Sequence, residues 1–457
     1  MKIIILGAGQ VGTSVAESLV SEANDITVVD VDGPRLRLLQ DRLDLRTILG
    51  SAAHPSVLKS AGVEDADMLI AVTQSDEINL VACKVAAHQY NVPTRIARIR
   101  APEYLANEQL FAPDCFAVDY AICPEQLITE YLVKLVKFPG ALQVLEFADG
   151  RVSLVAVRAF EGGPLVGHQL QDIRTHIPNV DVRVAAIFRG DRPIVPEGTT
   201  VVEVGDEVFC LAASQNIRKV MQELRRMDKP AHRIMIAGGG NIGLRFARAL
   251  EHDYTVKILE HNKRRCEELS TQLDTALVLQ GDVTDESLLE AENVEEMDLF
   301  VAVTNDDENN IMSCLLAKRM GARRVVALIN RRSYVDLLQS GQIDIAISPA
   351  QATIGKLLAH VRRGDVVAVH SLRRGAAEAL EAVVHGDRDS CRLTGRLVGE
   401  VELPAGATIG AVVRGDQVLM AHHDTKIEAE DHVIMFVTDK KTLPRVEKLF
   451  QLGARFL

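Results

Sequence analysis

Residues 2–12 read KIIILGAGQVG and residues 233–243 read RIMIAGGGNIG, so one pattern occurs twice in the chain, 231 positions apart. In each stretch an apolar run typical of a buried strand leads into a G-x-G-x-x-G turn, and a helical pattern follows. The next apolar runs, DITVVD and YTVKILE, end in Asp30 and Glu260. A glycine turn between a strand and a helix, with an acidic residue closing the next strand, is typical of dinucleotide-binding Rossmann domains.

The similarity between the two halves extends well beyond the turns. ADMLIAVTQSDEINLVACKVA at 66–86 aligns without a gap with MDLFVAVTNDDENNIMSCLLA at 297–317. Further along, AAIFRGDRPIVPEGTTVVEVGDEVFCL matches GAVVRGDQVLMAHHDTKIEAEDHVIMF, with Arg189 on Arg414 and Asp206 on Asp431. We therefore interpret the chain as a tandem duplication.

Each half alternates short apolar strands with helical stretches, which predicts an α/β fold with a doubly wound parallel sheet. Pro124 and Pro349 then open amphipathic helices that either cover their own domain or pack against something else, such as another subunit. Short alternating strands and a closing helix predict a small α+β module at the end of each half. The expected segments are 1–123, 124–139 and 140–226 in the first half, and 232–348, 349–365 and 366–457 in the second.

Composition excludes several classes of function. A formal net charge of −12 over 457 residues disfavours binding to nucleic acid and direct docking on anionic lipid. The seven cysteines form no C-x-x-C pair, so neither a disulfide framework nor a zinc site is expected. No transmembrane stretch and no signal peptide are apparent, so we expect a cytoplasmic protein that reaches a membrane only through a partner.

The glycine turns are the candidate ligand sites. The first glycine of each motif permits the tight turn, the second lets a pyrophosphate approach the backbone, and the third lets the helix pack close to the sheet. Free backbone N–H groups and the positive end of the helix dipole then face the phosphates. The candidate residues are Gly7, Ala8, Gly9, Gln10, Val11 and Gly12, and Gly238, Gly239, Gly240, Asn241, Ile242 and Gly243.

Two acidic residues set the expected cofactor. Asp30 and Glu260 are placed to accept hydrogen bonds from the adenosine ribose hydroxyls, and their charge would repel a 2′-phosphate. The sequence therefore favours NAD(H) over NADP(H). The alternative is that a copy keeps the turn without binding a ligand.

Polar residues follow the fourth strand of each half, at the sheet edge where doubly wound folds bind ligands. Thr73 and Gln74 in the first half correspond to Thr304 and Asn305 in the second, and all four are candidate contacts to phosphate or nicotinamide ribose. The acidic residues that follow, at positions 76 and 307, are expected to cap the next helix.

Arg98 and Arg100 leave the fifth strand near the same edge. They either reach a nucleotide phosphate or form an ordinary surface pair. The second half has Leu328 and Asn330 at the matching points, so we do not expect its site to be equivalent.

The order of Rossmann unit, crossover helix and small α+β module resembles the RCK (regulator of potassium conductance, or KTN) family. The blocks DITVVD, DADMLIAVT and RIARIR carry the resemblance, which spans nearly the whole chain. It implies a ring, a homotetramer built from dimers, on the cytoplasmic face of the inner membrane. The implied partner is the membrane-embedded, channel-like subunit of a Trk potassium uptake system. It also implies binding of NAD(H) and, in some members, regulation by ATP or ADP.

The resemblance carries nucleotide contacts onto the two turns and onto the polar and acidic residues after them. Leu328 departs from the pattern, which puts the phosphate contacts of the second site in doubt. The contacts outside the turns are Asp30, Thr73, Gln74 and Arg98 in the first half, and Glu260, Thr304 and Asn305 in the second.

An NAD-dependent dehydrogenase is the rival interpretation. It needs a proton donor or acceptor aimed at the nicotinamide, but the search for a Tyr-x-x-x-Lys pair finds only Tyr131 and Lys134, one residue too close. A redox-responsive transcription factor is a third possibility, which the acidic charge and the missing DNA-reading helix disfavour. Repeated sites suit a gating ring, because their preferences for one state add up. We therefore expect a regulatory subunit with no catalytic residues and no metal ligands.

Overall fold

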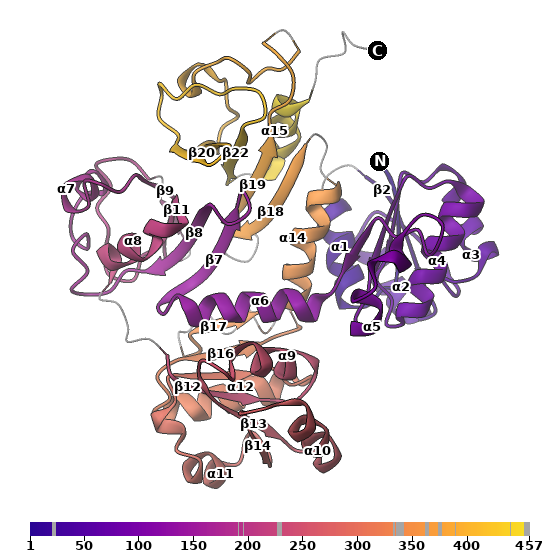
Figure 1. Cartoon of the computed structure of the whole chain (residues 1–457). Helices are drawn as coiled ribbons and strands as arrows, with labels where there is room; N and C mark the ends of the chain where they lie inside the picture. Colours follow the sequence, from indigo (N-terminus) through magenta and orange to yellow (C-terminus); the bar gives the residue numbers. More distant parts are fainter. Residues whose placement is uncertain are drawn as a thin grey trace.

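The structure is a computed structural model of the whole chain (Figure 1). The boundary expected between the two halves falls partly outside the described residues. In the part of the chain that is described, no helix is long and apolar enough to cross a bilayer. The described residues are 1–20, 24–190, 192–194, 196–225, 231–331, 334, 342–361, 365–372, 377–388, 390–438 and 440–451.

The first unit is a six-stranded parallel sheet in the order β3-β2-β1-β4-β5-β6, with helices on both faces. Alternate residues of β1 explain why both faces are covered: Ile3 and Ile5 belong to the core beneath α1, whereas Ile4 and Leu6 belong to the core beneath α4. The elements are β1 (Lys2–Leu6), α1 (Gln10–Val20), β2 (Asp25–Asp30), α2 (Gly33–Arg42), β3 (Arg46–Leu49), α3 (Pro55–Ser60), β4 (Met68–Ala71), α4 (Asp76–Tyr90), β5 (Thr94–Arg98), α5 (Pro102–Leu105) and β6 (Tyr120–Ile122).

The second unit repeats this plan, with a parallel sheet in the order β14-β13-β12-β15-β16-β17. Both sheets have the strand order of the Rossmann fold, which confirms the expected fold class and its duplication. The elements are β12 (Arg233–Ala237), α9 (Asn241–Leu250), β13 (Thr255–Glu260), α10 (Lys263–Gln272), β14 (Leu277–Gln280), α11 (Glu286–Ala291), β15 (Leu299–Ala302), α12 (Asp307–Arg319), β16 (Val325–Leu328) and β17 (Ile345–Ile347).

The crossover helices α6 (Pro124–Lys137) and α14 (Pro349–Val361) each pack against the Rossmann unit of the other half of the chain. α6 packs on α9, and its Ile128 and Leu132 belong to the core of the second unit. α14 packs on α1, and its Leu357 belongs to the core of the first unit. The two helices also pack on each other, α6 above the second unit and α14 beside the first (Figure 1). Each helix therefore packs outside its own Rossmann unit, as one of the two alternatives expected, and what it covers is the other half of the same chain.

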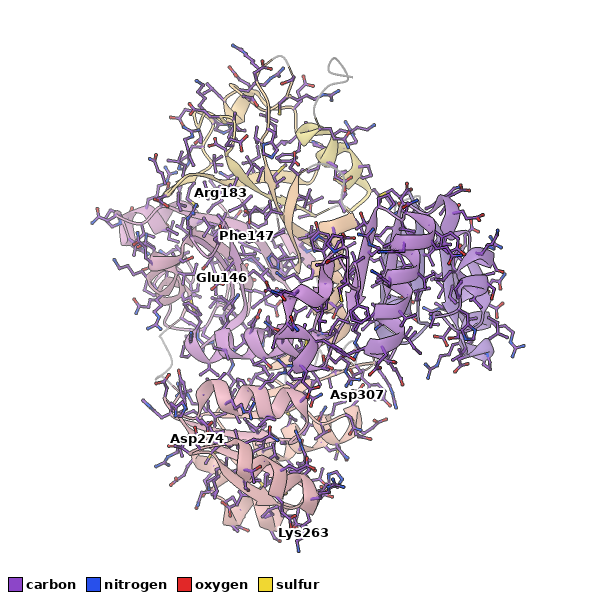
Figure 2. All side chains as sticks on the ribbon, turned by 45° about the vertical axis from the view of Figure 1, so that its right-hand side comes forward. Glu146, Phe147, Arg183, Lys263, Asp274 and Asp307 are labelled. Carbon is purple, nitrogen blue, oxygen red and sulfur yellow. The ribbon has the colours of Figure 1, made fainter. Side chains whose placement is uncertain are left out.

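The small modules are antiparallel sheets, each closed by a helix at its end, in the orders β10-β9-β11-β8-β7 and β18-β19-β22-β20-β21. α8 and α15 cover one face of each sheet, and the opposite faces pack against each other through residues such as Phe147, Phe209 and Phe436. Figure 2 places Phe147 and Arg183 where the modules meet. The elements are β7 (Ala141–Phe147), β8 (Val152–Arg158), α7 (Ile173–His176), β9 (Val182–Arg189), β10 (Arg192–Ile194), β11 (Glu207–Ala213), α8 (Ile217–Leu224), β18 (Val366–Leu372), β19 (Ala377–Val383), β20 (Ala407–Arg414), β21 (Gln417–Met420), β22 (His432–Val437) and α15 (Leu443–Phe450).

The arginine–aspartate pairs that align between the modules hold corresponding turns. Asp206 is fully buried and accepts hydrogen bonds from Arg189 Nε and Nη2 at 2.9 and 3.0 Å. Asp431 is equally buried and accepts both bonds from Arg414 at 2.8 Å. A bidentate pair of this kind fixes geometry as well as charge, so these residues have a structural role in both modules.

His370 lies at the interface between the modules. Its ring meets Phe147 edge-on, with 5.0 Å between centroids, and it hydrogen-bonds the backbone of Glu146. Burial, together with the nearby charges of Lys356 and Lys134, lowers the pKa of His370 to about 4. The imidazole is therefore neutral at the interface.

We expect acid to weaken this interface. The pKa of His370 is lower in the folded chain than in the unfolded one, so unfolding takes up a proton between about pH 6.5 and pH 4 and the free energy of unfolding falls over that window. The expected contribution is about 1–2 kcal/mol between pH 7 and pH 5. Urea unfolding of the wild type and of His370→Gln, which keeps a hydrogen-bond donor without titrating, measures it. An identical pH dependence in both proteins would contradict the assignment.

Candidate nucleotide-binding site

The first and third glycines of each turn are required by the fold itself. Gly7 and Gly238 have φ values of +109° and +112°, in the region that favours glycine. A Cβ on Gly12 would lie 1.8 Å from the carbonyl oxygen of Gly7, and a Cβ on Gly243 would lie 2.0 Å from that of Gly238. The helices α1 and α9 therefore start in direct contact with the turns that precede them.

The second glycine of each turn faces open space. A Cβ on Gly9 or on Gly240 would meet no atom within 4 Å. Each glycine directly precedes a helix, α1 at Gln10 and α9 at Asn241, so the free N–H groups of a helix N-terminus lie beside the opening. The arrangement leaves the room and the donors that a phosphate needs.

The acidic residues at the ends of β2 and β13 hold the turns. Asp30 accepts hydrogen bonds from the amides of Ala8 at 2.5 Å and Asp32 at 2.8 Å, one on each carboxylate oxygen. Glu260 makes the corresponding pair in the second unit, with the amide of Gly239 at 2.9 Å. Each oxygen keeps a second lone pair, so a ribose hydroxyl has an acceptor available at either site.

Thr73 is held by Asn79, a fully buried residue of α4. The Thr73 hydroxyl lies 2.7 Å from Asn79 Oδ1, and Asn79 Nδ2 donates to the carbonyl of Arg98 at 2.8 Å. The asparagine thus ties the ends of β4 and β5 together. Asn79 Oδ1 accepts the hydrogen bond that the Thr73 hydroxyl donates, and the hydroxyl oxygen accepts from the amide of Ser75 at 3.3 Å, which leaves it one lone pair for a ligand.

The second unit has the same network. Thr304 bonds Asn310 at 2.7 Å, and Asn310 Nδ2 donates to the carbonyl of Leu328 at 2.9 Å. Neither Asn79 nor Asn310 is among the residues expected from the sequence. The sequence does contain a signal for them, because both asparagines stand at matching positions of the repeated block.

The expectation that Asp76 and Asp307 cap helices is wrong. The caps of α4 and α12 are Ser75 and Asp306, one position earlier, because those residues have the extended backbone that a cap needs. Asp76 is already helical, and its carboxylate accepts the amide of Arg100 at 2.8 Å. Asp307 makes the corresponding bonds in the second unit. These two residues secure the loops after β5 and β16.

Both turns open onto one cavity of about 1100 Å³, which lies between the two Rossmann units. Sites for single small ligands usually measure roughly 300–1,000 Å³. Figure 2 shows Asp307, the first residue of α12, on the side of the second unit nearest the first. All the sequence-predicted residues line the cavity except Ala8, Gly12, Gly239 and Gly243.

The two ends of the cavity differ in charge. Arg98 and Arg100 line the first end, where Glu125 Oε1 lies 2.8 Å from Arg100 Nε and 3.7 Å from Arg98 Nη2. Burial lowers the pKa of Arg98. These arginines are therefore part of the cavity wall and not an ordinary surface pair. The matching positions of the second unit are Leu328, Asn330 and Ala350, which also line the cavity.

Glu125 is not among the residues expected from the sequence. It follows Pro124 at the start of α6, and no glutamate stands at the corresponding point of the repeat. A sequence signal for it was absent, because its role depends on the fold bringing the start of α6 beside the end of β5.

Comparison with known proteins places the chain in a family. A model of the TrkA-N domain matches residues 3–124 and 234–349, and a model of the TrkA-C domain matches residues 154–225 and 388–451. The Trk system potassium uptake protein TrkA of Halomonas elongata is 59% identical over 456 residues, and that of Vibrio alginolyticus is 57% identical over 458. Each alignment covers 100% of both chains.

The chain belongs to the TrkA family.

Solved structures share the fold of this TrkA-family chain. The crystal structure of the GsuK RCK domain has a TM-score of 0.61 at 18% identity and covers 98% of this chain and 94% of its own. The GsuK channel bound to NAD also has a TM-score of 0.61 at 18% identity, with coverages of 98% and 78%. At this identity the likeness extends to the fold alone.

Proposed function

We propose that this TrkA-family chain is a regulatory subunit of potassium uptake that binds NAD(H) at its glycine turns. The observation that carries the proposal is the common cavity, onto which both turns open. Residues of both Rossmann units line the cavity, so a ligand that contacts both stabilises one arrangement of the units over another wherever its contacts differ between them.

The residues around each turn fit a dinucleotide. The space in front of Gly9 and Gly240 suits a pyrophosphate, and Asp30 and Glu260 offer acceptors to ribose. We extend the proposal to ATP or ADP at the first turn, because Arg98 and Arg100 stand there where the second unit has Leu328 and Asn330.

The proposed partner is the membrane-embedded, channel-like subunit of a Trk system. The relatives from Halomonas elongata and Vibrio alginolyticus are named potassium uptake proteins, and they align along their whole length. We propose that the chain acts from the cytoplasmic face of the membrane as a homotetramer built from dimers. A ring of duplicated chains would add the preferences of many modest sites.

The rival dehydrogenase interpretation lacks a proton donor at Tyr131. Its hydroxyl donates to the carbonyl of Leu142 at 2.9 Å, and burial raises its pKa. The hydroxyl is therefore engaged in the packing of α6 and is not available to a substrate in the cavity.

Calorimetric titration with NADH tests the proposal. We expect micromolar binding by the purified chain and no change in NADH absorbance when common carbonyl or hydroxy-acid substrates are added. Potassium flux through the co-purified membrane subunit is expected to change with the nucleotide supplied. Absence of binding by NADH, NAD⁺, ADP and ATP would refute the nucleotide role, and sustained turnover would establish the dehydrogenase instead.

A further inference from the structure

Glu125 is an internal anion in the wall of the cavity. It is 8% exposed, and a single oxygen, Oε1, lies near both Arg98 and Arg100. Arg98 Nε is buried and has no hydrogen-bond partner among the described residues. Two guanidinium groups present ten N–H donors, many more than one carboxylate accepts. The cluster is therefore incompletely satisfied in hydrogen bonds, although the carboxylates of Glu125 and Asp76 both lie close enough to act on the charge of Arg98.

The second end of the cavity has no such cluster. Ala350 stands where Glu125 stands in the first half, at the second residue of α14, and Leu328 replaces Arg98. An anion bound at the first turn therefore competes with the carboxylate of Glu125 for the two arginines. At the second turn no carboxylate stands at the matching position.

Glu125 also connects the two turns through the crossover helix α6. It lies in the first turn of α6, and further along this helix Ile128 and Leu132 are buried in the core of the second unit. α6 packs on α9, which begins at Asn241 directly after Gly240. One end of α6 therefore lies at the first phosphate cradle, and its body lies on the helix that forms the second.

We infer that a nucleotide phosphate displaces Glu125 from Arg98 and Arg100, and that this exchange couples the first turn to the second through α6 and α9. The inference rests on the proposed function, since it needs a nucleotide at the first turn. Both anions require the same two cations, so they compete. The displaced carboxylate is then buried beside a phosphate without its partners, a position unfavourable enough to move the start of α6.

The shift reaches α9 because the interface between the helices is closely packed. Side chains in a packed core have no free space in which to absorb a displacement, so the neighbour moves as well. The coupling is reciprocal, so a ligand at either turn changes the affinity of the other by the same factor.

Glu125→Gln, made in a Gly240→Asp background that closes the second turn, tests the inference. We expect NADH and ADP, titrated separately, to bind the first turn about tenfold more tightly, because the internal competitor has lost its charge. In the Gly240→Asp parent, the same ligands are expected to change hydrogen exchange in 241–250. In the Glu125→Gln variant that change is expected to disappear although the first turn is occupied.

Glu130→Gln is the matched control, because Glu130 lies on the exposed side of the same helix and pairs with Gln126. It is expected to leave both the affinity and the exchange of 241–250 as in the parent. Should Glu125→Gln fail to fold, Arg100→Gln gives a second test: binding at the first turn weakens and the response of 241–250 is lost.

The outcomes separate the inference from the proposed function. Unchanged or weaker binding by a folded Glu125→Gln variant, or a persistent response of 241–250, would overturn the inference while leaving the nucleotide role intact. No binding by the parent protein, or by the wild type, would instead remove the proposed function and this inference with it.

Discussion

Replacing Gly9 with aspartate is expected to lower the affinity of the first turn for NADH by roughly 100-fold or more, equivalent to ~3 kcal/mol. The new side chain extends into the space that a Cβ on Gly9 leaves free, which is the proposed position of the pyrophosphate. It also sets a negative charge against the phosphates. Calorimetry on Gly9→Asp and on the wild type measures the difference, site by site.

Because the space beside Gly9 is free, the substitution is expected to change ligand binding without changing the stability of the fold. No atom lies within 4 Å of the added Cβ, so the thermal stability of the variant should equal that of the wild type. Gly240→Asp is the matched control, because it should abolish the second site and spare the first. Unchanged affinity in Gly9→Asp would show that the ligand does not occupy the first turn.

Replacing Gly12 with alanine is expected to destabilise the first Rossmann unit by about 3 kcal/mol, the upper part of the range for overpacking. The new Cβ would lie 1.8 Å from the carbonyl oxygen of Gly7, which is backbone and has little room to move. Urea unfolding followed by circular dichroism, with hydrogen exchange of β1 and α1 to locate the loss, measures the effect.

Two further alanine variants serve as a parallel test and a control for this expectation. Gly243→Ala creates the corresponding clash at 2.0 Å and should destabilise the second unit by a similar amount. Gly9→Ala adds the same methyl group without a neighbour and should leave the unfolding midpoint unchanged. A stable Gly12→Ala variant would mean that α1 moves away from the turn readily, against the close packing described above.

The fold could be predicted from the sequence because its determinants are local and occur twice. Gly7 and Asp30 mark a strand, a turn and the next strand within thirty residues, and Gly238 and Glu260 repeat them. The partner of the crossover helices could not be predicted. The apolar stripe of α6 shows that the helix is covered on one side, but two equivalent Rossmann units are available to cover it.

The candidate site could likewise be predicted only in part. The glycines and the residues at the ends of β4 and β15 follow from motif and topology, since parallel strands end at one sheet edge. The shared cavity and the place of Glu125 depend on how the two halves pack, which neither half records alone. The cap of α4 was misplaced by one position because serine and aspartate are both good capping residues. Only the backbone conformation, extended at Ser75 and helical from Asp76, shows which of the two is the cap.

The crossed arrangement of α6 and α14 bears on why two such units share one polypeptide. Separate half-chains would each leave an apolar helix face bare, and two identical copies would associate to cover both. Fusion keeps the partners together at any dilution. Fusion also lets one half change its sequence independently of the other, so that arginine stands at 98 and leucine at the matching position 328. A pair of identical chains cannot differ in this way, because every substitution appears in both copies.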